Sequence, residues 1–198
     1  FAVGNGDLVI SKDFTWSGPV AGIAAVGVAR SAYEYALNWC KTYTAGGKDP
    51  IIFHQNVGYM LTDVAMKIEA ARYLCWKAGH YADQYNCENH VLGAMGKIFG
   101  GEMALQCVYD CMRIVGVNSY DRRSHPFDKF MRDVICFPIY DAGNMGMQRR
   151  KIWGALAHPQ YNPRTFAENE EFCFTKEMEG LGTVTTPPEI ATKPSKAA

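Results

Sequence analysis

The chain has 198 residues, of which 48% are hydrophobic and 20% are charged, and this composition fits one globular domain with its own core. Twenty Lys and Arg residues balance twenty Asp and Glu residues, so no net field draws the protein to nucleic acid or to an anionic membrane. No apolar run approaches the roughly 20 residues of a membrane span, and the first residues lack the order of a signal peptide. We therefore expect no nucleic-acid partner and no membrane span, and an intracellular protein of the cytoplasm or the mitochondrial matrix.

The seven cysteines are an odd number and lie within apolar periodic segments, which is not the pattern of a disulfide framework. We expect them to be reduced. Cys107 and Cys111 stand four apart on a predicted helix and could in principle hold a metal. No histidine lies beside them and no second cysteine pair exists, so core packing is favoured and no metal site is predicted.

The first 13 residues are typical of the end of a preceding element. The chain begins with Phe1 and not with Met, and a short strand is possible at Leu8–Ile10. We interpret residues 1–13 as the end of an upstream segment or linker, and the sequence as a piece of a longer chain.

A long central helix is predicted from Ser17 to Tyr43. Ser17 is a candidate N-cap, and Pro19 falls in the first turn, where proline is tolerated. Small residues along the segment would let another backbone approach closely. They include Gly22, Ala25, Gly27 and Ala29.

Two further long helices follow. The pair Asp49–Pro50 supplies an N-cap and a proline for a helix to about Tyr81, whose apolar residues recur in steps of four and three. The same pattern runs from Val91 to Val115 and ends at Gly116, a natural C-cap.

The last part of the bundle is built from shorter helices. One is predicted at Phe127–Cys136, and Pro138 then forces the chain out of helical geometry before a last helix at Met145–Ala157. Residues 158–198 read as an irregular extension with a short helix possible at Ala167–Met178. The fold class is therefore all-α, an up-down helical bundle over residues 14–157.

Asp141 is the first candidate for chemistry. It follows five mostly apolar residues and precedes a glycine-containing turn into a helix, so apolar surroundings would make its carboxylate a stronger base. The helix N-terminus and the nearby Arg149 and Arg150 would favour its ionised form. A simple N-cap aspartate is the alternative. In a continuous last helix Gln148 would return to nearly the same face, with Arg149 offset by roughly 80–100°.

His54 and Gln55 open the second helix, where backbone N–H groups and side-chain donors could meet an anionic ligand. A solvated first turn is the alternative. The sequence contains no phosphate-binding P-loop, GxSxG or GxGxxG pattern, so nucleotide hydrolysis and serine-hydrolase chemistry have no support.

Four stretches together resemble the C-terminal helical domain of acyl-CoA dehydrogenases. They recur in the family's order and spacing over about residues 14–157: PVAGIAAVGVARSAYEYAL, IIFHQNVGYMLTDVAMKIEAARYLCWKA, MRIVGVNSY and HPFDKFMRDVICFPIYDAGNMGMQRR. The resemblance implies a flavoprotein fold in which an N-terminal helical domain and a middle β-domain precede this one.

The resemblance also implies roles for particular residues. The family's base, which removes the α-proton, matches Asp141, where most members have Glu. Its FAD contacts match His54, Gln55, Arg113, Ile114, Gly116, Val117, Ala142, Gly143 and Asn144. In the family some of these reach the FAD of a neighbouring subunit, which implies a homo-oligomer, commonly a tetramer, or a complementing chain that carries the missing domains.

Departures from the pattern favour the nitroalkane oxidase branch of the family. The base is Asp, Phe14 and Ser17 stand at the helix start, and the stretch Thr15–Gly18 lacks the Asp and Arg that usually contact coenzyme A. The branch carries an Arg two turns after its base, where this chain has Gln148. Another of its arginines, before the HQ motif, aligns with Ala45; Lys48 could substitute for it only as a point charge.

The implied function is that of an FAD-dependent oxidoreductase acting on a nitroalkane. Asp141 would take a proton from the carbon next to the electron-withdrawing group, Ser17 would hydrogen-bond near the flavin or substrate, and Arg149 would bias Asp141 toward its charged form. Two alternatives remain: an acyl-CoA dehydrogenase that acts on a CoA thioester, and a non-catalytic scaffold or split subunit. We do not expect these 198 residues to be active alone, because the β-domain that cradles the flavin ring is missing.

Overall fold

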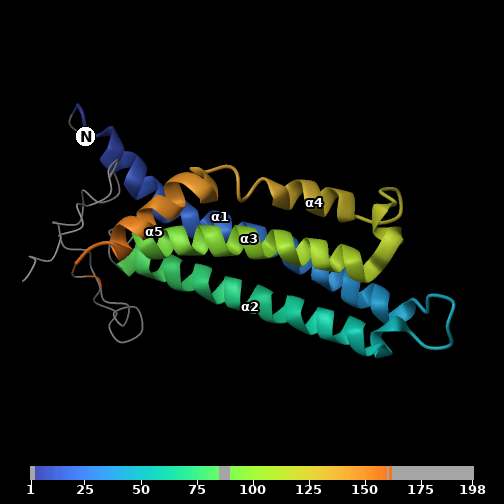
Figure 1. The fold of residues 1–198 in the computed structure, drawn as a ribbon. Helices are drawn as coiled ribbons and strands as arrows, with labels where there is room; N and C mark the ends of the chain where they lie inside the picture. The colour runs from blue at the N-terminus through green and yellow to red at the C-terminus, as the bar shows by residue number, and fades with distance from the viewer. Residues whose placement is uncertain (1–2, 85–89, 160, 162–198) are drawn as a thin grey trace, which may run out of the picture.

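A computed structural model describes residues 3–84, 90–159 and 161 (Figure 1). Three long helices, α1 (Gly6–Thr42), α2 (Gln55–Gln84) and α3 (His90–Val115), run alternately up and down and pack against one another. In the described part of the chain every regular element is helical, which confirms the all-α bundle.

The shorter elements complete the bundle. Helix α4 (Phe127–Ile135) lies along α1 and α3, and α5 (Arg149–Leu156) packs on α3 near the end where α3 begins (Figure 1). A 3₁₀ turn, η1 (Ile51–Phe53), precedes α2, and another, η2 (Gly116–Tyr120), follows α3. The segment η3 (Gly143–Gln148) is a π-helix directly before α5.

Helix α1 begins earlier than the sequence predicts. It starts at Gly6, so Ser17 is not its N-cap and Leu8–Ile10 is helix and not strand. Pro19 has no N–H to offer the carbonyl of Thr15, yet the helix continues through both residues. Thr15 is 1% exposed and lies against Gly93 of α3, so packing between helices holds this turn where local sequence alone would end it.

Close contact between α1 and α3 depends on glycines. A Cβ on Gly22 would lie 2.5 Å from the carbonyl oxygen of Gly96, and a Cβ on Gly100 would lie 2.8 Å from the Cα of Gly22. The prediction of small residues for close approach is confirmed for Gly22. It is wrong for Gly27, which is exposed and would place a Cβ in open space.

The other predicted helices are confirmed with small changes at their ends. Helix α2 buries the predicted apolar stripe, and α3 ends before Gly116, whose φ of +73° is that of a left-handed C-cap. The predicted short helix at Ala167–Met178 lies outside the described residues. The division of the chain into residues 1–13, 14–157 and 158–198 stays a prediction. The first boundary falls inside α1, which runs continuously from Gly6 to Thr42.

The main core lies where α1, α2 and α3 meet and includes Cys107 and Cys111, both fully buried. Core packing of these two cysteines is therefore confirmed. Five cysteines are free in the described residues, namely Cys40, Cys75, Cys107, Cys111 and Cys136. None of the described helices is both long and apolar enough to cross a membrane.

Candidate active site

The chain turns sharply between α4 and α5, and Asp141 lies in that turn. Asp141, Ala142 and Gly143 have φ values of 54°, 67° and 57°, a left-handed run that side chains other than glycine rarely adopt. The N–H of Asn144 donates to the carbonyl of Pro138 at 2.9 Å and closes the turn. The backbone at Asp141 is therefore strained and held by its surroundings.

Lys97 of α3 ties the turn down. Its ammonium donates to the carbonyl oxygens of Phe137 at 2.8 Å and of Tyr140 at 2.6 Å, and it lies 5.3 Å from the centre of the Tyr140 ring. Lys97 is 1% exposed, and this burial lowers its pKa, while the charge of Asp141 acts to raise it. The residue directly before Asp141 is thus fixed from the core.

Ser17 and Asp141 meet although they are far apart in the sequence. The Ser17 hydroxyl lies 3.4 Å from each carboxylate oxygen of Asp141, so it can donate to either one. Both side chains are half-buried. The structure brings these two predicted site residues together, with Ser17 in the interior of α1 and not at its start.

The predicted α-helix at Met145–Ala157 is wrong in its first turn, because residues 143–148 form the π-helix η3. Short π-helical segments are frequent at functional sites. Gln148 nevertheless returns to Asp141: its Nε2 donates to the Asp141 carbonyl at 3.1 Å. Asn144 is buried, and its Nδ2 reaches the Ile98 carbonyl at 3.4 Å.

Arg149 lies against α3. Its guanidinium forms an ion pair with Glu102 of α3 at 2.9 Å and donates to the carbonyl of Asn144 at 3.0 Å. The predicted influence of Arg149 on the charge of Asp141 stays a prediction. As the helical spacing predicts, Gln148 returns to Asp141 while Arg149 lies off that face and pairs with Glu102.

Lys151 was missed by sequence reasoning. It is 5% exposed, its Nζ is buried without a hydrogen-bond partner, and it lies 5.3 Å from the centre of the Phe14 ring. Burial lowers the pKa of Lys151, and the charge of Asp141 acts to raise it. The sequence does contain a sign of this burial. Asn144, Gln148, Lys151 and Ala155 are spaced four, three and four residues apart, which places them on one helix face, and all four are buried.

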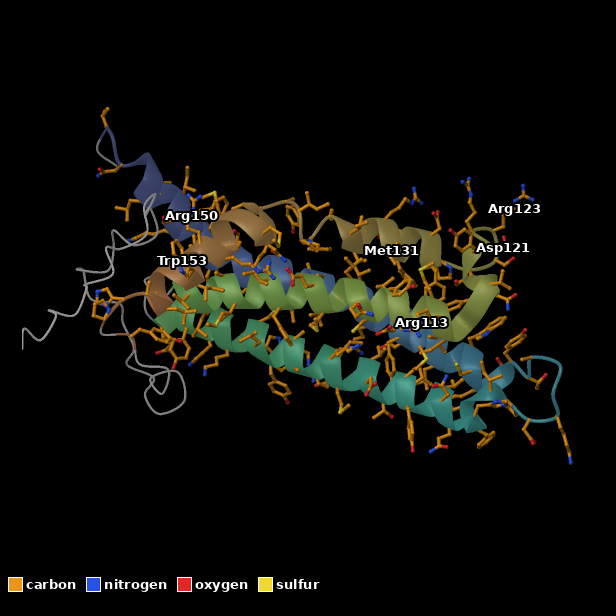
Figure 2. The ribbon with its side chains drawn as sticks, viewed as in Figure 1. Arg113, Asp121, Arg123, Met131, Arg150 and Trp153 are labelled. Atoms are coloured by element: carbon orange, nitrogen blue, oxygen red, sulfur yellow. The ribbon has the colours of Figure 1, made fainter. Side chains whose placement is uncertain are left out.

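The predicted FAD contacts fall into two groups. Ala142, Gly143 and Asn144 accompany Asp141, whereas the others gather where α2 begins and α3 ends. There His54, Gln55, Arg113 and Val117 are exposed and Ile114 is buried. Figure 2 shows Arg113 at the opposite end of the bundle from Arg150 and Trp153 of α5. Lys97 and Arg113 are 16 positions apart on α3, which is roughly 24 Å.

Asp110 holds Arg113 at that second end. Its buried carboxylate accepts hydrogen bonds from Lys67 at 3.0 Å, from Gln106 at 3.0 Å and from Arg113 at 3.3 Å. The hydrogen bond to Asp110 raises the pKa of Lys67. Asp110 was not among the predicted residues and acts on Arg113 from one turn away.

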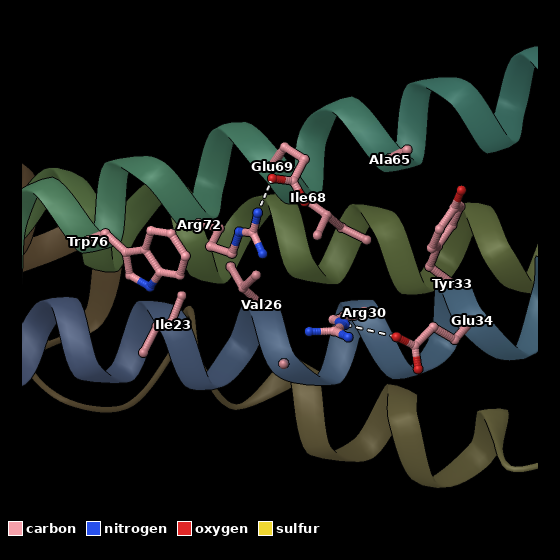
Figure 3. Close-up of a pocket in the computed structure, with 11 residues that line it drawn as sticks. Ile23, Val26, Arg30, Tyr33, Glu34, Ala65, Ile68, Glu69, Arg72 and Trp76 are labelled. Carbon is pink, nitrogen blue, oxygen red and sulfur yellow. Dashed lines mark hydrogen bonds and ion pairs between the residues drawn. The ribbon is translucent and has the colours of Figure 1, made fainter.

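A groove of about 520 Å³ lies between α1 and α2 (Figure 3). Its charged residues are paired, Arg30 with Glu34 at 2.8 Å and Arg72 with Glu69. Arg72 also lies over the ring of Trp76, at 4.7 Å from its centre. None of the predicted site residues lines this groove.

The fold and the site define a helical-bundle domain. Asp141 lies in a strained turn at one end of the bundle, and Arg113, paired with Asp110, lies at the other end. Residues 4–156 match the family model described as acyl-CoA dehydrogenase, C-terminal domain, and the chain belongs to that family.

Among its relatives is the nitroalkane oxidase of Fusarium oxysporum, 34% identical over 158 residues, which are 78% of this chain and 36% of that protein. The cyclohexane-1-carbonyl-CoA dehydrogenase of Geobacter metallireducens is 32% identical over 70% of this chain and 36% of its own length. An active-site variant of nitroalkane oxidase crystallised with 1-nitrooctane has a TM-score of 0.76 at 32% identity, covering 80% of this chain and 37% of that one. The chain thus spans little more than a third of these relatives.

Proposed function

We propose that this chain is the C-terminal domain of an FAD-dependent oxidoreductase that takes a proton from a nitroalkane with Asp141 as the base. The observation that carries the proposal is the carboxylate of Asp141, held in a strained turn with the Ser17 hydroxyl 3.4 Å from both of its oxygens. The nitroalkane oxidase relatives support the same substrate class.

Each residue of the site has a physical part in the reaction. The C–H bond next to the nitro group breaks, its proton goes to a carboxylate oxygen of Asp141, and the electron pair stays on a carbon that the nitro group stabilises. Ser17 orients the carboxylate, and Lys97 fixes the backbone before it. FAD, when bound, supplies the acceptor for two electrons.

The far end of the bundle fits a role in binding FAD. The guanidinium of Arg113 is exposed and is held by Asp110, and such a group can pair with a phosphate. Beside it Val117 is 86% and Tyr120 is 84% exposed, so apolar surface is available to a ring system. His54 and Gln55 add exposed polar groups at the start of α2.

The separation of the two ends supports an oligomer. Since Lys97 and Arg113 are roughly 24 Å apart along α3, the far end of one copy would serve a flavin whose ring faces Asp141 of another. We therefore propose a homo-oligomer, a tetramer by the family resemblance, or a complementing chain. The upstream helical domain and β-domain would come from the rest of the protein or from that chain.

A CoA thioester is the second candidate substrate, because the Geobacter relative is named for one. The stretch Thr15–Gly18, which matches the position of the family's usual contacts to coenzyme A, argues against this substrate. Thr15 is 1% exposed and Gly18 is packed on Gly93 of α3, so the stretch offers coenzyme A no charged side chain.

The test uses the protein isolated with whatever partner and flavin it carries, kept free of oxygen. Nitroethane and cyclohexane-1-carbonyl-CoA are added in separate experiments, and the flavin absorption is followed. We expect nitroethane to bleach the flavin and the thioester to leave it oxidised. Bleaching by the thioester alone would assign the second candidate, and a flavin that neither substrate reduces would overturn the oxidoreductase proposal.

A further inference from the structure

Three buried polar atoms on one helix face have no hydrogen-bond partner among the residues that the structure describes. They are Oδ1 of Asn144, Oε1 of Gln148 and Nζ of Lys151, and these residues are 0%, 0% and 5% exposed. In the described part of the chain only Trp39 and Arg72 have another such atom, so the unpaired atoms gather in η3 and α5. Buried polar groups are normally satisfied by protein or by ordered water, which makes this cluster a sign of a bound partner.

The hydrogen bonds of the two amides show which of their atoms are left over. Gln148 donates through Nε2 to the Asp141 carbonyl at 3.1 Å, and Asn144 donates through Nδ2 to the Ile98 carbonyl at 3.4 Å. A carbonyl oxygen can only accept, so each amide has to present its nitrogen there. The side-chain oxygens of both residues therefore remain as acceptors that need a donor.

Gln148 and Lys151 are placed to share one partner. They are three positions apart where η3 passes into α5, and such residues are neighbours on a helix, with Cβ atoms roughly 5–6 Å apart. Nζ of Lys151 lies over the Phe14 ring, 5.3 Å from its centre. Gln148 is bonded to Asp141, whose carboxylate meets Ser17, one turn along α1 from Phe14. Both side chains thus reach the same part of α1 and the turn beside it.

We propose that Oε1 of Gln148 and Nζ of Lys151 hold one internal water molecule between them. The partner has to donate to an amide oxygen and to accept from an ammonium, and water does both. Lys151 would repel a cation, and the amide oxygen would repel an anion. Internal waters typically make about three hydrogen bonds to buried polar groups of this kind. The side chain of Asn144 is bonded to α3 and lies outside this site.

The water would join α5 to the turn that carries the candidate base. The chain of hydrogen bonds runs from Lys151 through the water to Oε1 of Gln148, and from Nε2 of Gln148 to the Asp141 carbonyl. This link adds to the hold that Lys97 exerts on the same turn from α3. The inference concerns the hydration of the fold, so it does not depend on the proposed function.

The direct test is a crystal structure of the protein with whatever flavin and partner it carries, at a resolution that shows ordered waters. We expect density for a water about 2.7–3.2 Å from both Oε1 of Gln148 and Nζ of Lys151. The absence of a water at this place, or a direct hydrogen bond between the two side chains, overturns the inference.

Urea unfolding tests the same bridge in solution. Lys151→Met and Gln148→Met each leave a buried polar group without its bridge, so we expect each variant to lower the urea midpoint. The double variant removes both partners of the water, and its loss should be clearly smaller than the sum of the two single losses. Lys41→Met, which removes an exposed lysine at the far end of α1, should leave the midpoint in place. Losses that simply add contradict the bridge.

Discussion

Lys97 donates a hydrogen bond of 2.6 Å to the carbonyl oxygen of Tyr140, the residue directly before Asp141. A core helix thus holds, through one buried ammonium, the backbone of a turn in which two successive non-glycine residues, Asp141 and Ala142, have the costly left-handed conformation. The position of the candidate base depends on this clamp, and the clamp can be removed without touching Asp141.

Lys97→Met should lower the free energy of unfolding by about 1–3 kcal/mol, because two carbonyls lose their buried donor. Urea unfolding measures the change. Lys41→Met, which removes an exposed lysine, should stay within about 0.5 kcal/mol of the original protein. A Lys97→Met protein as stable as the original would show that the clamp is dispensable.

Gly22→Ala should destabilise the bundle by about 1–3 kcal/mol, because the new Cβ would lie 2.5 Å from the carbonyl of Gly96 and push α1 away from α3. Gly27→Ala is the matched control on the same helix. Its Cβ would enter open space, so the better helix propensity of alanine should stabilise the protein by about 0.5–1 kcal/mol. Thermal unfolding of both variants checks this, and equal effects would contradict the close approach of the helices.

Stability should fall above pH 9 because of the buried thiols. Burial raises the pKa of Cys40 to about 11, of Cys75 to about 12 and of Cys107 to about 11, and it also raises that of Cys111. The unfolded chain therefore releases thiol protons first, so the stabilisation is complete below pH 9 and is lost as pH rises toward the folded values. The lowered pKa values of Lys97 and Lys151 act in the opposite direction, since their burial penalty is relieved as the pH rises.

Cys75→Ala isolates the thiol effect. Between pH 8 and pH 10.5 it should lose about 1–2 kcal/mol less stability than the original protein. Urea unfolding at the two pH values provides the comparison. The same loss in both proteins would show that Cys75 does not stay protonated in the folded state.

Asp110→Asn should cost about 1–2 kcal/mol and release Arg113. The amide cannot form the ion pairs with Lys67 and Arg113, although both cations keep partial contact with water and the loss is therefore modest. The variant should also retain less FAD during purification. Glu34→Gln breaks the exposed pair with Arg30 and should change neither property. Full flavin retention in Asp110→Asn would contradict the role given to Asp110.

The sequence predicts the bundle well because each long helix carries an apolar stripe that local spacing reveals. It fails at the start of α1, where contact between Thr15 and Gly93 carries the helix through Pro19. It fails again in the first turn after Asp141, where residues 143–148 form a π-helix and not the predicted α-helix. Such outcomes depend on contacts between helices, which local propensity does not contain.

The sequence also predicts only part of the candidate site, because some of its residues are brought there by contacts between helices. The apolar residues before Asp141 and the turn after it mark Asp141 as a candidate, the family resemblance adds Ser17, and the structure brings the two together. Lys97 and Lys151 look like ordinary surface lysines in their local sequence. Only their place on the buried stripes of α3 and α5 marks them as part of the site.

The central claim is that Asp141 removes the substrate proton, and the most direct test is the rate of flavin reduction in Asp141→Asn. The variant and the original protein are isolated with equal flavin content and mixed with nitroethane in the absence of oxygen. We expect flavin to stay bound in the variant and its reduction to slow by about 10²–10⁴-fold, the usual contribution of a general base. Reduction at the original rate would contradict the account.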